Sequence, residues 1–142
     1  MKKKIKLYDS TLRDGAQTKG VNFSLNDKLK IISLLDEIGI DYIEGGWPGA
    51  NPTDNVFFQK LPKLSNSKAV AFGMMRKSGK SSQNDPGLNA VLNSGVSTVC
   101  LVGKSWDFHV KNALKIPLNK NLDMISDTIA FASKRVDEVL FD

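Results

Sequence analysis

The sequence has 142 residues, of which 41% are hydrophobic and 25% are charged, as in a typical globular protein and unlike a disordered one. Its net charge is +5, yet no basic block is interleaved with aromatic residues, which argues against nucleic-acid binding. No apolar run is long enough to span a membrane, and no secretory signal is evident, so we expect no membrane association. The one cysteine, Cys100, permits no internal disulfide, lies in an apolar segment and should be buried; it favours a cytoplasmic location.

The first half of the chain alternates apolar segments with helical patterns. Residues 4–9 predict a strand, and residues 15–23 a loop. Ser24, with Asp27 three residues later, forms a capping-box pattern and opens a helix that Gly39 should end. Residues 40–44 predict a second strand, broken by the glycines and proline of residues 45–49, and residues 54–61 a short helix. The expected buried stripe of the first helix is Leu25, Leu29, Ile32, Leu35 and Ile38.

The second half continues the alternation. Residues 68–74 predict a third strand, residues 75–84 a polar loop, and residues 85–93 a helix opened by Asp85 and Pro86. Residues 96–102 form a continuous apolar run, typical of a strand that is buried on both faces. Residues 109–114 predict a helical turn, residues 119–135 a long helix, and residues 136–141 a fifth strand. The expected buried stripe of the long helix is Leu122, Ile125, Ile129 and Ala132.

This order of elements predicts an α/β fold with a parallel sheet, because right-handed crossovers connect strands that alternate with helices. A repeating β/α unit of about thirty residues suits the N-terminal portion of a (β/α)8 TIM barrel, with five of its eight strands. An open, doubly wound parallel sheet is the alternative, although the first loop lacks a GxGxxG sequence. A barrel that stopped at the fifth strand would leave an apolar edge, so we expect a fragment of a longer protein.

Polar side chains follow each predicted strand, and in a barrel all these strand ends face one rim. Their convergence predicts an active site there. The residues concerned are Asp9, Arg13, Asp14, Gln17, Glu44, Trp47, Met75, Arg76, Lys104, Asp107, His109 and Asp142.

The first of these clusters is the densest. Asp14 can offer a hard anionic oxygen to a divalent cation, and Arg13 beside it can hold a carboxylate or stabilise an oxyanion. Gly15 would serve either a turn with positive φ or the close approach of a ligand. A salt-bridged corner without a ligand is the simpler interpretation of an Arg-Asp pair alone.

The longer strings around these residues resemble a known family. STLRDGAQ at residues 10–17 resembles the first-strand signature of the DRE-TIM metallolyases. That superfamily includes 2-isopropylmalate, homocitrate and citramalate synthases, hydroxymethylglutaryl-CoA lyase and the carboxyltransferase domain of pyruvate carboxylase. YIEGGWPGANPTD at residues 42–54 and GKSWDFHV at residues 103–110 resemble the citramalate synthase branch. The resemblance covers the whole chain, as the N-terminal part of a pyruvate carboxyltransferase-like (HMGL-like) domain.

The resemblance implies an acyltransferase that condenses acetyl-CoA with a 2-oxo acid in branched-chain amino-acid biosynthesis. With pyruvate the product is citramalate, toward isoleucine; with 2-oxoisovalerate it is 2-isopropylmalate, toward leucine. It also implies a divalent metal ion (Mn, Mg or Zn), small-molecule substrates and a homodimeric parent protein. A homocitrate synthase and a related lyase remain alternatives, as does a non-catalytic α/β binding module.

The resemblance also implies roles for individual residues. Arg13 would be catalytic and contact the oxo acid and the developing alkoxide, while Asp14 would bind the metal. Gln17 would line the substrate site, and Glu44 would position Arg13 or the substrate. The family's His-x-His metal ligands lie on a later strand, so His109 is not their equivalent and the 142-residue chain alone is predicted to be inactive.

The remaining rim residues carry open alternatives. Lys104 and Asp107 could touch substrate or coenzyme, or could pair with each other. Arg76 could reach a phosphate or remain a solvated loop residue. Trp47 is expected to pack under its loop.

Overall fold

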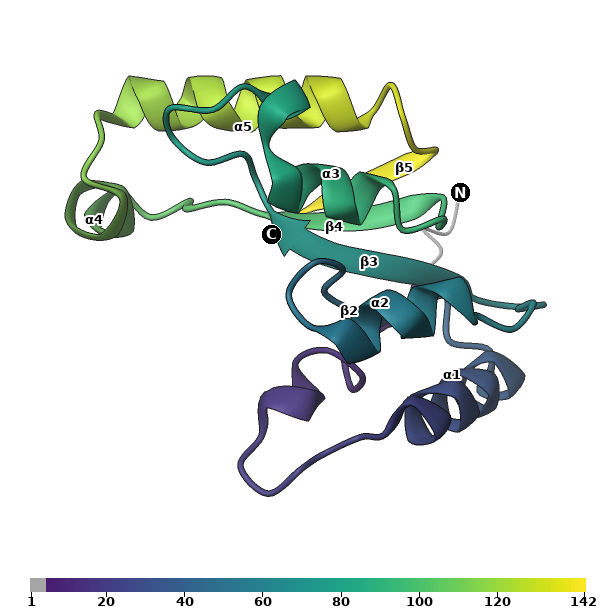
Figure 1. The fold of residues 1–142 in the computed structure, drawn as a ribbon. Helices are drawn as coiled ribbons and strands as arrows, with labels where there is room; N and C mark the ends of the chain where they lie inside the picture. The colour runs from purple at the N-terminus through teal and green to yellow at the C-terminus, as the bar shows by residue number, and fades with distance from the viewer. Residues whose placement is uncertain (1–4) are drawn as a thin grey trace.

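The protein forms one parallel sheet whose strands follow each other in chain order (Figure 1). The computed structural model describes residues 5–142. Each strand pairs in parallel with the next. The strands are β1 (Tyr8–Asp9), β2 (Tyr42–Gly46), β3 (Lys68–Met74), β4 (Thr98–Val102) and β5 (Glu138–Phe141).

Helices connect the strands. The α-helices are α1 (Leu25–Ile38), α2 (Pro52–Gln59), α3 (Pro86–Leu92), α4 (Asp107–His109) and α5 (Leu118–Ala132). Turns of other helix types are η1 (Gly15–Gln17), η2 (Ser82–Asn84) and η3 (Val110–Leu114). Within the part of the chain that the structure describes, none of the helices has the length and apolar character needed to cross a membrane.

The strand order decides between the two predicted architectures. A doubly wound sheet reverses its order at a switch point and carries helices on both faces. Here the order β1-β2-β3-β4-β5 never reverses, as in a barrel wall. The prediction of a TIM-barrel portion is confirmed as a curled half-barrel, and the open doubly wound sheet is excluded.

Alternate residues of the strands face two different cores. Ile43, Ala71 and Val99 join the larger core, which includes buried side chains of α1, α2, α3 and α5. The neighbouring residues Tyr42 and Cys100 belong to a second, smaller cluster with Val70 and the partly buried Leu140. Because successive side chains of a strand point to opposite faces, this second cluster marks the inner, concave face of the half-barrel.

All the predicted strands and long helices are present, but β4 and β5 each begin two residues later than predicted and α5 ends three residues earlier. Several predicted caps and bounds are confirmed. The Ser24 hydroxyl accepts a hydrogen bond from the Asp27 amide, the Asp27 carboxylate accepts one from the Ser24 amide, and Gly39 ends α1 with φ 86°. Asp85 caps α3 by accepting from the amides of Gly87 and Leu88. The strand over residues 68–74 agrees with the prediction at both ends, and β4 is buried on both faces.

The second strand corrects the prediction, because β2 runs through Gly45 and Gly46 instead of ending before them. The glycines are needed for packing. A Cβ on Gly45 would lie 2.4 Å from the Phe57 ring, and one on Gly46 would lie 2.5 Å from the Asp54 carboxyl carbon. The β-sheet register shifts here, between Glu44 and Gly46.

Three further predictions are wrong in part. The first strand comprises only Tyr8 and Asp9; residues 5–7 are not in the sheet, and Lys4 lies outside the described residues. The helix predicted to begin at Asp54 begins at Pro52, after the N-cap Asn51. Two members of the expected helical stripes, Ile38 and Leu122, are 73% and 64% exposed.

Candidate functional site

The turn after β1 sets the position of the Arg-Asp pair. The amides of Arg13, Asp14 and Gly15 all donate to the Ser10 carbonyl oxygen, at 3.1, 2.8 and 3.2 Å. Gly15 does not have a positive φ, and a Cβ there would meet the Thr11 methyl at 3.7 Å, an ordinary contact. The expectation of a positive-φ turn at this glycine is therefore wrong. Because the three amides donate to the same Ser10 carbonyl oxygen, the chain makes a tight turn that places Arg13 and Asp14 just after the end of β1.

Arg13 is held by three neighbours. Its Nε donates to Glu44 Oε1, and its Nη1 donates to Asp14 Oδ1 at 3.2 Å. Its guanidinium carbon lies 3.9 Å from the centre of the Phe72 ring, a cation–π contact. The side chain is only 17% exposed. The guanidinium is therefore fixed in both direction and plane.

Glu44 is buried and is the centre of a hydrogen-bonded triad with Tyr8 and Arg13. Its side chain is 2% exposed, and its second oxygen, Oε2, accepts from the Tyr8 hydroxyl at 2.5 Å. Burial, followed by this hydrogen bond, raises the pKa of Tyr8 well above its ordinary value. Tyr8 therefore stays protonated and remains a donor. The two Glu44 oxygens are thus divided between a phenol and a guanidinium, which supports the expected role of Glu44 in positioning Arg13.

Asp14 differs from Glu44 in its exposure. Its side chain is 64% exposed. One of its oxygens accepts from Arg13, and a carboxylate has capacity for further partners, including a hard divalent cation. Among residues 5–142 there is no group of three His, Cys, Asp or Glu side chains that could hold a metal. The Asp14 carboxylate has the donor chemistry of one ligand to a divalent ion.

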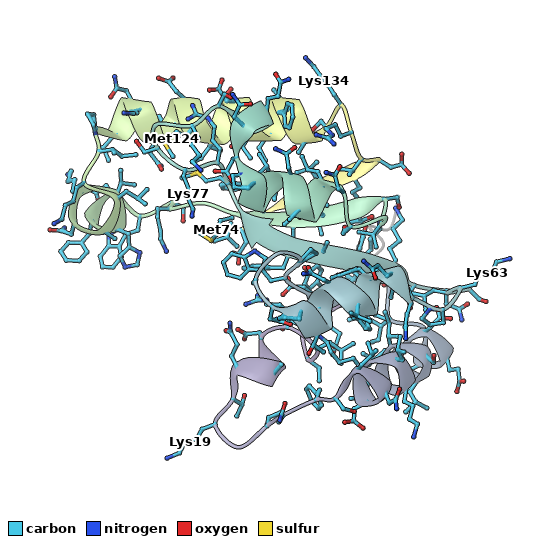
Figure 2. The ribbon with its side chains drawn as sticks, viewed as in Figure 1. Lys19, Lys63, Met74, Lys77, Met124 and Lys134 are labelled. Atoms are coloured by element: carbon cyan, nitrogen blue, oxygen red, sulfur yellow. The ribbon has the colours of Figure 1, made fainter. Side chains whose placement is uncertain are left out.

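Gln17 lines a cavity of about 330 Å³ beside Arg13, between the loop after β1 and the start of α2. Figure 2 shows Lys19 farther along this loop, extending away from the sheet. A buried ion pair between Lys28 and Asp54 also borders the cavity. The lining residues are Leu12, Arg13, Ala16, Gln17, Asn22, Phe23, Lys28, Trp47, Ala50, Asn51, Thr53 and Asp54.

Residues beyond the first two strands are engaged in local contacts. Asp107 pairs with Lys111 at 2.7 Å and not with Lys104, which corrects one of the alternatives considered above. Arg76 binds the Asp127 carboxylate at 2.6 Å and is 13% exposed, so it is not a solvated loop residue. The His109 ring packs against exposed Trp106, with ring centres 4.7 Å apart.

The other predicted rim residues lie at the ends of β3, β4 and β5. Met75 is buried, and its amide donates to the Val102 carbonyl at 3.0 Å. The Asp142 carbonyl accepts from the Gly103 amide at 3.1 Å. Met74 and Lys77 lie at the same end of β3 (Figure 2).

Sequence reasoning missed three residues of the site: Tyr8, Phe72 and Asp54. Tyr8 and Phe72 each lie on the inner face, at alternate positions of their strands. That alternation was available in the sequence, but the pairing of one strand's residue with another's depends on the sheet register. Asp54 belongs to the string that carried the resemblance, and its buried partner Lys28 lies on another helix.

Comparison with known proteins places this geometry in a family. The sequence profile of the HMGL-like family matches residues 4–142. The chain belongs to the HMGL-like family. This family membership agrees with the strand order and with the polar residues gathered where the first strands end.

Two curated relatives that are similar over nearly the whole chain share one name. The chain is 49% identical to the (R)-citramalate synthase of Aquifex aeolicus over 100% of this chain and 27% of that protein. It is 44% identical to the (R)-citramalate synthase of Sulfolobus acidocaldarius, over 99% of this chain and 27% of that protein. A 2-isopropylmalate synthase of Sulfurisphaera tokodaii is 28% identical, over 92% of this chain and 32% of that protein. The chain therefore spans about a quarter to a third of the length of these relatives.

Solved structures confirm the fold. The crystal structure of hydroxymethylglutaryl-CoA lyase from Pseudomonas aeruginosa superposes with a TM-score of 0.72 at 19% identity. The superposition covers 97% of this chain and 45% of that chain.

Proposed function

We propose that residues 1–142 form the N-terminal part of the catalytic barrel of a metal-dependent acyltransferase. The reaction would be the condensation of acetyl-CoA with a 2-oxo acid. The observation that carries the proposal is the Arg13 guanidinium, fixed by buried Glu44 and the Phe72 ring beside exposed Asp14. Higher identity to citramalate synthases than to the 2-isopropylmalate synthase supports pyruvate as the acceptor and citramalate as the product.

Arg13 would act directly on the oxo acid. An arginine has five N–H donors, so Arg13 can keep its contacts with Glu44 and Asp14 and still bind the substrate carboxylate. The same donors would stabilise the alkoxide that forms when the keto carbon is attacked. Because the guanidinium is already held in place, little reorganisation is needed at the moment of reaction.

Asp14 would supply one carboxylate oxygen to the divalent ion, which is Mn, Mg or Zn. When bound, such an ion polarises the keto group as a Lewis acid. Gln17, on the wall of the neighbouring cavity, would line the oxo-acid site. The proposal includes a cytoplasmic location and a homodimer, since both accompany small-molecule synthases of this kind.

The test is an assay of the natural full-length protein that carries this sequence. Release of coenzyme A is measured with a thiol reagent, with acetyl-CoA and each of pyruvate, 2-oxoisovalerate and 2-oxoglutarate, and with each metal. We expect release with pyruvate and formation of citramalate. Preference for 2-oxoisovalerate or 2-oxoglutarate would replace citramalate synthase with 2-isopropylmalate or homocitrate synthase, and no release with any acid would reject the proposal.

A matched pair of variants assigns the chemistry to Arg13. Arg13→Lys keeps the charge but loses the planar set of donors, so we expect kcat to fall about a hundredfold to a thousandfold. Arg135→Lys changes an arginine that bonds to Asn89 and Asn93, away from the site, and should leave kcat unchanged. Equal activity of the two variants would remove Arg13 from the mechanism.

A further inference from the structure

A buried ion pair lies beneath the turn that follows β2. Lys28 Nζ, from α1, donates to Asp54 Oδ1, from α2, and the two residues are 3% and 6% exposed. Removing two charges from water costs several kcal/mol per ion, so a buried pair is weak evidence of a stabilising role. The contacts made by the second oxygen of Asp54 suggest a different role.

Asp54 Oδ2 fixes the backbone at the end of β2. It accepts from the Trp47 amide at 2.8 Å and from Asn51 Nδ2 at 2.8 Å. The carboxylate also packs against Gly46, where a Cβ would lie 2.5 Å from the carboxyl carbon. Asp54 therefore fixes the backbone where the chain leaves β2, and with it the position from which the Trp47 side chain extends.

From Trp47 the contacts lead to Arg13. The Trp47 ring packs edge-on against the Phe72 ring, with centres 5.3 Å apart and planes at 81°. The Phe72 ring in turn carries the Arg13 guanidinium at 3.9 Å. Lys28, Asp54, Trp47 and Arg13 also border the same cavity. A shift of the turn after β2 would therefore move the ring on which Arg13 rests.

We propose that Asp54 is a positioning residue for Arg13, acting through Trp47 and Phe72, with the Lys28 ammonium group holding the Asp54 carboxylate in place. Asp54 is not assigned any contact with substrate. Its catalytic consequence rests on the proposed function, but its effect on the position of Arg13 does not.

Asp36 offers a matched control. It is an aspartate of similar burial, 8% exposed, and it also accepts three hydrogen bonds. Its donors are the amides of Ser65, Asn66 and Ser67, at 2.9, 2.8 and 2.8 Å, just before β3 begins. Asp36 thus lies at the opposite end of the sheet from Arg13. If Asp54 were only structural, Asp54→Asn and Asp36→Asn should behave alike.

The first measurement does not depend on activity. In the 142-residue chain labelled with ¹⁵N-arginine, the Nε–H resonance of Arg13 reports its hydrogen bond to Glu44 and its place over the Phe72 ring; Arg13→Lys assigns it. We expect Asp54→Asn to shift this resonance, and Asp36→Asn to leave it unchanged. The signals of Arg76 and Arg135 are internal references. Trp47→Leu keeps the Lys28–Asp54 ion pair and should also shift the Arg13 resonance. It is the variant to use if Asp54→Asn does not fold.

The second measurement is kinetic and uses the natural full-length protein. We expect Asp54→Asn to lower kcat about tenfold to a hundredfold with a smaller change in KM, because misplacement of a catalytic group by about 1 Å has effects of that size. Asp36→Asn should retain kcat. An unmoved Arg13 resonance in a folded Asp54→Asn chain would overturn the proposal, and so would an unmoved resonance in Trp47→Leu, because Asp54 is proposed to act through Trp47. If the unmodified protein shows no turnover, the proposed function fails, while the resonance still decides the role of Asp54.

Discussion

At the scale of single residues, Arg13 is notable for the variety of its partners. One partner is a buried carboxylate, another an exposed carboxylate, and the third an aromatic face. The buried carboxylate restrains the guanidinium strongly because it is itself held by Tyr8. The exposed carboxylate of Asp14 remains accessible to a ligand.

This division of roles gives a prediction for Glu44→Gln. The neutral amide cannot serve both Tyr8 and Arg13 as a charged acceptor, so the guanidinium would lose its main restraint. We expect kcat for citramalate formation to fall about tenfold to a hundredfold in the full-length protein. Tyr8→Phe, which removes only the hydrogen bond to Oε2, should have a smaller effect. A Glu44→Gln enzyme with unchanged kcat would show that Arg13 is positioned by other groups.

The sequence predicted Arg13, Asp14, Gln17 and Glu44 as candidate site residues, but not Tyr8 or Phe72, whose contacts depend on how the strands pair. Arg13 and Asp14 were predicted because their neighbours in the sequence define the pattern. Tyr8 was not, because its contact with Glu44 depends on the pairing of β1 with β2. The alternative that paired Asp107 with Lys104 is wrong because α4 continues into η3. This continuation places Lys111 one helical turn after Asp107, within reach of its carboxylate.

At the scale of elements, the hydrophobic repeat located the long helix but predicted only part of its buried face. The buried positions of α5 are Asn121, Met124, Thr128 and Ala132, and of these the expected stripe contained only Ala132. The polar members have specific partners. Asn121 donates to the Lys104 carbonyl at 2.8 Å, and Thr128 accepts from the Arg76 amide at 3.2 Å. Hydrophobic periodicity cannot recognise a face that is buried through hydrogen bonds.

The end of α1 provides a prediction about pH. Hydrogen bonds from the Ser65 amide, and then from those of Asn66 and Ser67, lower the pKa of Asp36 in the folded state. A carboxyl group whose pKa is lower in the folded state stabilises the fold at pH values above its unfolded-state pKa, which is about 3.9 for aspartate. This stabilisation is lost as the pH falls through the folded-state pKa.

We therefore expect Asp36→Asn to be less stable than the parent at neutral pH, with the difference shrinking below about pH 4. Urea unfolding followed by circular dichroism across this range measures it. Asp123→Asn, at an exposed position of α5, is the control and should not show this pattern. A destabilisation of constant size at every pH would mean that the charge of Asp36 is not involved.

At the scale of the whole molecule, the alternation of strands and helices was sufficient to predict the architecture. Every crossover has the same direction, so sequential strand order follows once all the strands are parallel. The glycine pair of β2 was misread because glycine often interrupts strands, whereas here it makes room for Phe57 and Asp54. That requirement arises only after α2 has packed against the sheet.

The 142-residue chain alone is predicted to form no citramalate from pyruvate and acetyl-CoA, with or without added metal. The physical reason is that residues 5–142 offer no cluster of three metal ligands around Asp14. Mass spectrometry of the reaction, with the Arg13→Lys chain as background, makes the measurement. Citramalate above that background would contradict the prediction.

The shortness of β1 has a consequence for the order of folding. This strand contributes only two residues to the sheet, paired with Tyr42 and Ile43, yet the Arg-Asp turn follows it directly. Its backbone ladder is too small to hold the turn by itself, so Arg13 can settle only after β2 and β3 present Glu44 and Phe72. The amide protons of residues 13–15 would then become protected from exchange with solvent late in folding. Transient detachment of this one strand would withdraw the Arg13 guanidinium while the rest of the sheet stays intact.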